Sequence, residues 1–401
     1  MKKYLLALAI FASSGLGART VELSDAIKIV TQSYPTVESA QFSLNAEKDS
    51  TLPLYFPENP MLGIMTEKGM KSWTLSQDIL FPSKYYHRGE AQYQRTLAAQ
   101  EEFRNKKLEM RQEIISAYFN AFRQIKTVEL LQAQRDLLRE IARIAEGRRI
   151  TGQVTAQDEM KAHLEQAKME NEILTAGEDL ESGKARLQEL LGLEDSIELG
   201  KVDKPRLKMT SGQLNEISLQ ETPSLKAAFF AVEESNALKN FAAGSFLPDF
   251  RISLKRSLEK DNNDKTFALE ARIPLWFWGK ESGDFSAAQA KKAIAQRNLE
   301  SAQRLAKSGQ RSLAAKIIAK ENVLKLYETT LIPQSLSTIT SSRSAYKAGR
   351  ANFLELLDSE RTVYGLQINY YQELKEFSLA LAEFEKMAGQ SVSSLPWEDY
   401  L

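Results

Sequence analysis

The chain has 401 residues, no cysteine and two histidines, and its 53 lysines and arginines balance 53 acidic residues. This composition excludes thiolate metal sites and cysteine nucleophiles, disfavours a histidine-based zinc site, and offers no basic footprint for nucleic acid. No G-x-S-x-G, Walker A or H-E-x-x-H motif is present, so we expect a protein that is not an enzyme and needs no cofactor.

The first residues carry the pattern of a secretory signal peptide. Two lysines precede the apolar run Tyr4–Ala12, and the small residues Ser13–Ala18 follow it. That apolar run is too short to span a bilayer, and no later run approaches ~18 consecutive apolar residues. We therefore expect a signal peptide over residues 1–18, rather than a buried N-terminal helix, and no transmembrane helix.

The rest of the chain divides into two similar halves. Pro35 and Pro60 lie 25 positions apart, and Pro223 and Pro248 repeat this spacing 188 positions later. In each half the second proline is followed by two alternating segments, a very long helical pattern and a glycine-centred break. The shared order of these landmarks predicts an internal duplication. The expected parts are a first repeat at 19–200, a second repeat at 201–390, and a C-terminal tail at 391–401 without an assignable role.

Apolar residues recurring at three and four positions predict helices in each repeat. The longest spans roughly 65 residues, or ~98 Å, which implies coiled-coil packing rather than a globular core. A proline at 333 should bend or loosen its counterpart. The expected helices are 24–51, 84–149 and 156–191 in the first repeat, and 214–243, 280–347 and 351–387 in the second.

Segments of alternating character predict two strand hairpins, at 60–81 and 248–278. In the clearest one an apolar face alternates with a polar face that carries Glu270 and Arg272. Strands of about ten residues with this pattern are typical of a transmembrane β-barrel with a wet lumen. Four strands cannot close a barrel, so several copies would each contribute four. The strands alone leave open hydrophobic packing in a soluble protein.

Aromatic residues gather where the predicted strands meet the helices. Tyrosine and tryptophan favour membrane–water interfaces, so we expect lipid at this level. Three nearby methionines are interpreted as lipid-facing or core residues rather than as a soft-metal relay. The aromatic residues are Phe81, Trp276, Phe277 and Trp278, and the methionines are Met61, Met65 and Met70.

The doubled order of short helix, proline, strand hairpin, long helix, glycine turn and return helix resembles the TolC-type outer-membrane efflux proteins. The stretch "PENPML" (Pro57–Leu62) and the Gly279-Lys280 pair look most like the heavy-metal and cation efflux branch. The resemblance implies a mainly α fold with a small transmembrane β part. Three copies would form a periplasmic α-barrel of coiled-coil helices and a twelve-stranded β-barrel.

The same resemblance implies a function. The homotrimer would be a passive exit duct in the outer membrane of a Gram-negative bacterium, extending into the periplasm and surrounded by outer-membrane lipid. It would conduct metal cations or small toxic compounds from a periplasmic adaptor (membrane fusion) protein and an inner-membrane pump to the exterior.

Site residues also follow from the resemblance. Glu355 and Asp358 match acids after the second turn, and three copies would stack them as two carboxylate rings that attract cations. A solvated acidic helix face is the alternative reading. Asp158 matches a gate acid and Tyr346 a gate tyrosine. The family's gate arginine position holds Ala351, so Arg350, one residue earlier, is the expected substitute.

The two glycine turns should also meet the hairpin tips of the adaptor, because small residues leave the backbone accessible there. The residues expected at this contact are Gly152, Val154, Gly349 and Ala351.

Two other functions remain open at this level. A soluble periplasmic coiled-coil adaptor or scaffold would also contain long helices, although an adaptor should pair one helical hairpin with a strand-dense region. The duct of a type I protein secretion system would share the whole architecture, and the sequence does not separate export of ions, drugs or polypeptides.

Overall fold

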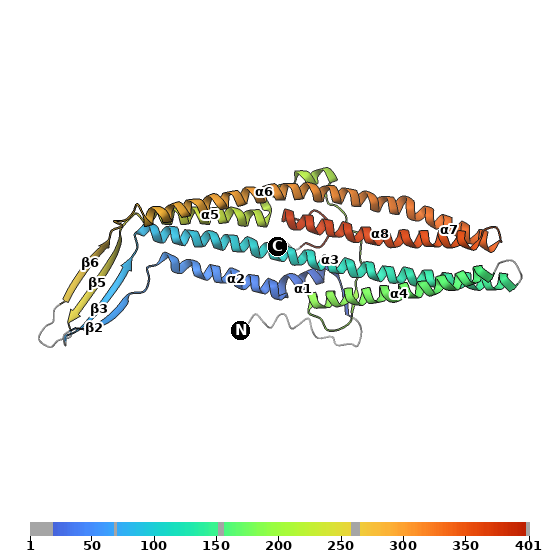
Figure 1. Ribbon diagram of the computed structural model, residues 1–401, viewed down its shortest axis with the longest axis horizontal. Coiled ribbons are helices and arrows are strands. Elements are labelled where there is room, and N and C mark those ends of the chain that lie inside the picture. The colour runs from blue at the N-terminus through green and yellow to red at the C-terminus, as the bar shows by residue number, and fades with distance from the viewer. Residues whose placement is uncertain (1–18, 68–69, 151–155, 258–264, 398–401) are drawn as a thin grey trace.

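The computed structural model describes residues 19–67, 70–150, 156–257 and 265–397, so the expected signal peptide lies outside the described residues. These residues form a long helical body with a small sheet at one end (Figure 1). The larger elements are α1 Leu23–Ser33, α2 Pro35–Thr51, β2 Met61–Glu67, β3 Met70–Ile79, α3 Pro82–Ile150, α4 Ala156–Leu191, α5 Pro223–Gly244, β5 Asp249–Ser257, β6 Lys265–Arg272, α6 Lys280–Leu326, α7 Ile332–Lys347 and α8 Phe353–Ala388. A short parallel pair, β1 Arg19–Val21 and β4 Ile197–Leu199, lies beside the body.

Prolines decide where the short helices begin, and here two expected boundaries were wrong. The helix expected over 24–51 is two helices, because Tyr34 is extended and Pro35 starts α2. The helix expected from 214 begins only at Pro223, after two short 3₁₀ turns. In both cases the residue before proline is driven out of the α conformation, while proline itself suits the first helical position.

The helix expected over 280–347 is interrupted just before Pro333. A π-helical turn, η5 Tyr327–Leu331, separates α6 from α7. Proline lacks an N–H and its ring collides with the carbonyl four residues earlier, so the backbone must rearrange there. Lys204 Nζ contacts both carboxylate oxygens of Glu328 in this turn at 2.9 Å, and the Tyr370 hydroxyl donates to Glu328 Oε1 at 2.9 Å.

Two buried clusters hold the helices together. The larger lies in the middle of the body and joins α1, α3, α6 and α8 with the end of α4. The smaller lies toward the end remote from the sheet and joins α3, α4, α7 and α8. Gly192 and Gly389 end α4 and α8 with φ of 64° and 68°, as glycine C-caps do. Among the described helices, none is both long and apolar enough to cross a membrane.

The start of the C-terminal tail is part of the larger cluster. Val392 and Ser393 are fully buried. Glu385 Oε1 accepts hydrogen bonds from both of their backbone N–H groups at 2.9 Å. The other oxygen of this carboxylate pairs with Arg111 at 2.7 Å, with both side chains almost completely buried. The tail to which we assigned no role therefore packs against α3 and α8.

The four-stranded sheet has the order β2-β3-β5-β6 and is antiparallel throughout. Its register aligns Leu62, Leu75, Leu254 and Phe267 in one row, and all four are exposed. The opposite face carries the rows Thr74–Lys255–Thr266 and Ser76–Ser253–Ala268. One face is therefore mainly apolar and the other mainly polar, and among the described residues none covers the apolar row.

The sheet corrects two details of the sequence interpretation. The second hairpin ends at Arg272 rather than at 278. Pro274 follows two residues later, and proline has no backbone N–H to donate to a neighbouring strand. Trp276, Phe277 and Trp278 lie beyond the strand in a turn, exposed and in edge-to-face contact. The strand register also places Met61 opposite Ser76 and Met65 opposite Ser72, on the polar face rather than on the apolar one.

Candidate functional site

The end of the body remote from the sheet holds the residues that we expected at a pore gate. The turn between α7 and α8 is described in full. Gly349 has a φ of 74°, and the N–H of Arg350 donates to the carbonyl of Ala345 at 2.9 Å. This left-handed conformation suits glycine and lets the chain reverse in a few residues.

Asn352 fixes the start of α8 and, with it, the two acidic residues. Its Oδ1 accepts from the N–H of Glu355 at 2.9 Å, and its Nδ2 donates to Glu355 Oε1 at 3.0 Å. This reciprocal pair is an N-terminal capping arrangement. Glu355 and Asp358 are both exposed and lie three positions apart on α8. The carboxylates are therefore accessible, and Glu355 also has a local structural task that the sequence interpretation did not include.

Tyr346 is buried rather than displayed on the surface. Its side chain is 1% exposed, and its ring packs against that of Phe353 at 6.5 Å between centroids. Arg148, near the end of α3, donates from Nη1 to the Tyr346 carbonyl at 3.0 Å and lies 5.2 Å from the centre of its ring. Arg350, the expected substitute for the gate arginine, is exposed in the turn. Among the described residues, the arginine that contacts Tyr346 is thus Arg148, which no local motif indicates.

Two further ion pairs join the helix pair α3–α4 to the pair α7–α8. Lys347 Nζ lies 3.2 Å from Glu140 Oε1, and Arg361 pairs with Glu165. Burial acts to raise the pKa of Glu165, but hydrogen bonds from Lys168 and Arg361 hold it below its ordinary value. Charged groups therefore link the two helix pairs near their tips.

An ion pair with a buried carboxylate lies within the second helix pair. Glu360 on α8 is 0% exposed, and Arg343 on α7 donates to it from Nε at 2.9 Å. Burial raises the pKa of Glu360, although Arg343 opposes the rise. The Ser342 and Ser359 hydroxyls lie 2.9 Å apart beside the pair. This contact ties α7 to α8 below the turn.

The described residues include little of the first turn. Gly152 and Val154 lie outside the described residues, and Asp158 belongs to α4 but its side chain is not among those described. The expectations for these three residues stay predictions.

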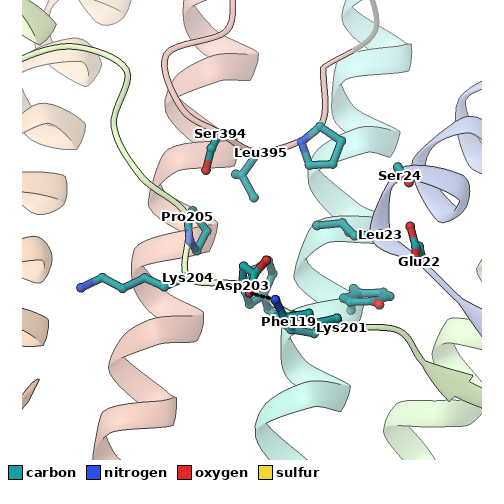
Figure 2. Close-up of a pocket in the computed structure, with 13 residues that line it drawn as sticks. Glu22, Leu23, Ser24, Phe119, Lys201, Asp203, Lys204, Pro205, Ser394 and Leu395 are labelled. Carbon is teal, nitrogen blue, oxygen red and sulfur yellow. Dashed lines mark ion pairs between the residues drawn. The ribbon is translucent and has the colours of Figure 1, made fainter.

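The described residues also contain a pocket of about 200 Å³ beside the middle of the body. Figure 2 shows Glu22, Ser24, Lys201, Asp203 and Ser394 around it, with Lys201 paired to Asp203 at 3.2 Å. Phe119 and Leu395 contribute apolar surface. Within the described part of the chain, no group of three histidine, cysteine or acidic residues is placed to hold a metal ion. We see no nucleophile with an adjacent base in this pocket, so the tip region remains the stronger candidate.

Comparisons with known proteins bear on the family and the fold of the chain. Residues 214–390 match the model of a family described as outer membrane efflux protein. The chain is 24% identical over 299 residues to the cobalt-zinc-cadmium resistance protein CzcC of Cupriavidus metallidurans, which covers 70% of this chain and 68% of that protein. A membrane protein from Pseudomonas aeruginosa has a similar structure, with a TM-score of 0.80, 16% identity and coverage of 96% of this chain and 93% of its own. The structure of CusC gives a TM-score of 0.79 at 15% identity, covering 96% of each chain. At these identities the structural likeness establishes the fold.

Proposed function

Residues 214–390 match the outer membrane efflux protein family, and we propose that the chain is a member of this family and serves as the passive exit duct of a tripartite efflux system. It is an outer-membrane protein that extends into the periplasm. In the proposed assembly three copies close into one channel, which receives its substrate from a periplasmic adaptor and an inner-membrane pump. The chain acts as a channel and not as an enzyme.

The observation that carries this proposal is that two opposite sides of the chain each expose an unpaired strand edge and large apolar side chains. Figure 1 shows β2, α2 and α4 along one side and β6, α6 and α7 along the other. Both edge strands have an unpaired side within the described sheet. Large apolar side chains are exposed on both helical edges, which in a monomer would face water. They are Phe42, Met160, Leu164 and Leu174 on one side and Ile294, Leu305, Leu326 and Leu336 on the other.

A ring of copies would bury both sides at once. An edge strand inside a bilayer needs a partner, because lipid cannot accept its hydrogen bonds. Three sectors of four strands would give a closed barrel of twelve, with the apolar row of Leu62, Leu75, Leu254 and Phe267 toward lipid and the polar face toward the lumen. The exposed aromatics Trp276, Phe277 and Trp278, together with Phe81, would then lie at the membrane interface.

The order of elements supports the proposed division of the chain. A short helix, a strand pair, a long helix and a return helix occur in this order twice. We infer that 19–200 and 201–390 are structural repeats, that 1–18 is a signal peptide, and that each repeat supplies one helix pair to the periplasmic tunnel.

At the tips the repeats would form the gate. Glu355 and Asp358 would contribute two carboxylate rings, and Asp158 a further acid. The contacts of Arg148 with Tyr346 and of Lys347 with Glu140 would hold the helix pairs together in the closed state.

We place the adaptor contact at the same end of the molecule and infer the substrate class from a relative. Gly152, Val154, Gly349 and Ala351 would meet the adaptor. The likeness to a cobalt-zinc-cadmium resistance protein supports divalent metal cations as the substrate class.

Ion selectivity in reconstituted bilayers tests the proposal. Glu355→Gln combined with Asp358→Asn should lower the ratio of cation to anion permeability by about threefold or more, because rings of carboxylates attract cations. Glu181→Gln, at an exposed acid on α4 far from the tip, is the matched control and should leave the ratio unchanged. An unchanged ratio in the double variant would remove the pore role of the two acids. A protein that stays soluble without detergent as a monomeric rod would overturn the duct itself.

A further inference from the structure

Charged residues on the polar face of the sheet gather in two adjacent rows next to the helices. The register aligns Asp78 on β3 with Arg251 on β5 and Glu270 on β6. In the next row on the same face, Asp249 lies opposite Arg272. Farther along the sheet this face carries serine, threonine, alanine and a lysine. The five charged residues of the two rows near the helices line a hollow of about 330 Å³.

Most of these charges are neutralised by partners within the chain. Arg251 contacts Asp78 with two parallel hydrogen bonds, Nε to Oδ1 at 2.6 Å and Nη2 to Oδ2 at 2.9 Å. Lys84, in the first turn of α3, is almost buried and donates to Asp249 Oδ1 at 2.7 Å. Two-point contacts between arginine and carboxylate are among the strongest charge pairs in proteins. These two ion pairs therefore neutralise the charges of Asp78, Arg251, Lys84 and Asp249.

Glu270 and Arg272 differ from these four residues in their position. Both lie on the edge strand β6, both are exposed, and they share one face at a spacing of two residues. Two residues along a strand correspond to about 7 Å. In the proposed ring of copies the next strand would be β2, whose polar face carries the uncharged residues Met61, Gly63 and Met65. Among the described side chains of β2, none on this face carries a charge that could compensate either of them.

We propose that Glu270 and Arg272 form a charge-balanced collar at the base of the barrel lumen, one anionic ring and one cationic ring stacked along the channel. This inference rests on the proposed function, because it needs three copies with the polar face inward. The two rings are closer together than the Debye length of about 8–10 Å, so their fields largely cancel away from the wall. The collar therefore lets both cations and anions pass. Selection of cations over anions then occurs at the acidic rings of the tips.

The collar predicts opposite effects for two single substitutions. Glu270→Gln leaves the cationic ring alone and should shift the permeability ratio toward anions, by about twofold to fivefold, since charges beside a wide aqueous lumen are partly screened. Arg272→Gln should shift it toward cations by a similar factor. The double variant should return close to the wild-type ratio, because both rings are then removed together.

The experiment measures reversal potentials in planar bilayers under a potassium chloride gradient. The charge-keeping variants Glu270→Asp and Arg272→Lys should retain the wild-type ratio, and Arg297→Gln, at an exposed position on α6, serves as the matched control. Shifts of opposite sign that cancel in the double variant support the collar. Wild-type conductance with no shift in either single variant overturns the collar and leaves the duct intact. An inserted wild-type protein that conducts no ions overturns both.

Discussion

Glu385→Leu should detach the C-terminal segment from the helical body at a large cost in stability. The Glu385 carboxylate is 0% exposed and pairs with Arg111, which is 1% exposed. Its other oxygen accepts from the N–H of Val392 and from the N–H and hydroxyl of Ser393. Leucine would leave a buried guanidinium and two buried amide donors without this acceptor. Removing one partner of a buried ion pair costs about 3–5 kcal/mol.

Arg111 also contacts the C-terminal segment directly. Its Nε donates to the Pro396 carbonyl at 2.9 Å, and its guanidinium lies 4.7 Å from the centre of the Trp397 ring. Glu385→Gln retains an acceptor oxygen and loses only the charge, so it should cost less, about 1–3 kcal/mol. Arg111→Met combined with Glu385→Leu should recover only part of the loss, because it removes the unpaired guanidinium but leaves the N–H groups of Val392 and Ser393 without an acceptor.

Thermal melting followed by circular dichroism in detergent, at one protein concentration, measures the effect. Glu385→Leu should lower Tm by roughly 5–10 °C, and amide hydrogen exchange over residues 389–397 should accelerate. Glu373→Leu is the matched control on the same helix, since Glu373 pairs with Lys320 at a site about a quarter exposed and should cost about 1 kcal/mol. Wild-type melting and wild-type exchange in Glu385→Leu would refute the reasoning.

Two further predictions concern single sites. Gly389→Ala should destabilise the protein more than Gly192→Ala in the same melting assay. Both glycines have φ near +65°, but only at Gly389 would a Cβ lie 2.5 Å from the Glu221 carbonyl oxygen; equal costs would contradict the packing argument. Burial raises the pKa of Glu360 above its ordinary 4.5. The folded chain therefore binds this proton more tightly, and the stability it contributes is present below pH 4.5 and lost as pH rises through the raised pKa. Glu360→Gln should flatten that part of the pH dependence of Tm, and an unchanged slope would argue against the assignment.

Much of the helical architecture could be predicted from local patterns. The return helix at 156–191 was predicted with its observed bounds, and the glycines after both return helices have the positive φ that C-caps need. The alternation in the strands correctly separated the apolar face from the polar face. Helix starts were predicted less well, because the effect of Pro35 and Pro223 on the preceding residue was not applied. These features depend on neighbours within one helical turn or one strand, which a sequence contains directly.

The candidate site was predicted less completely, because its decisive contacts join residues far apart in the chain. Arg148 contacts Tyr346 across 198 positions, and no spacing rule indicates which arginine does so. The sequence placed the acids Glu355 and Asp358 on one helix, but not the capping contact with Asn352 that orients Glu355.

The sequence by itself determined the long helices, the turns and the two-faced strands, since each follows from local backbone preference and from the periodicity of apolar residues. Only the tertiary structure decided which charges meet. The pairing of Asp78 with Arg251 spans 173 positions, and that of Arg111 with Glu385 spans 274. Such pairings depend on how strands align and how helices pack against one another. Because many alignments would satisfy the same local pattern, the partners become definite only when all elements are packed together.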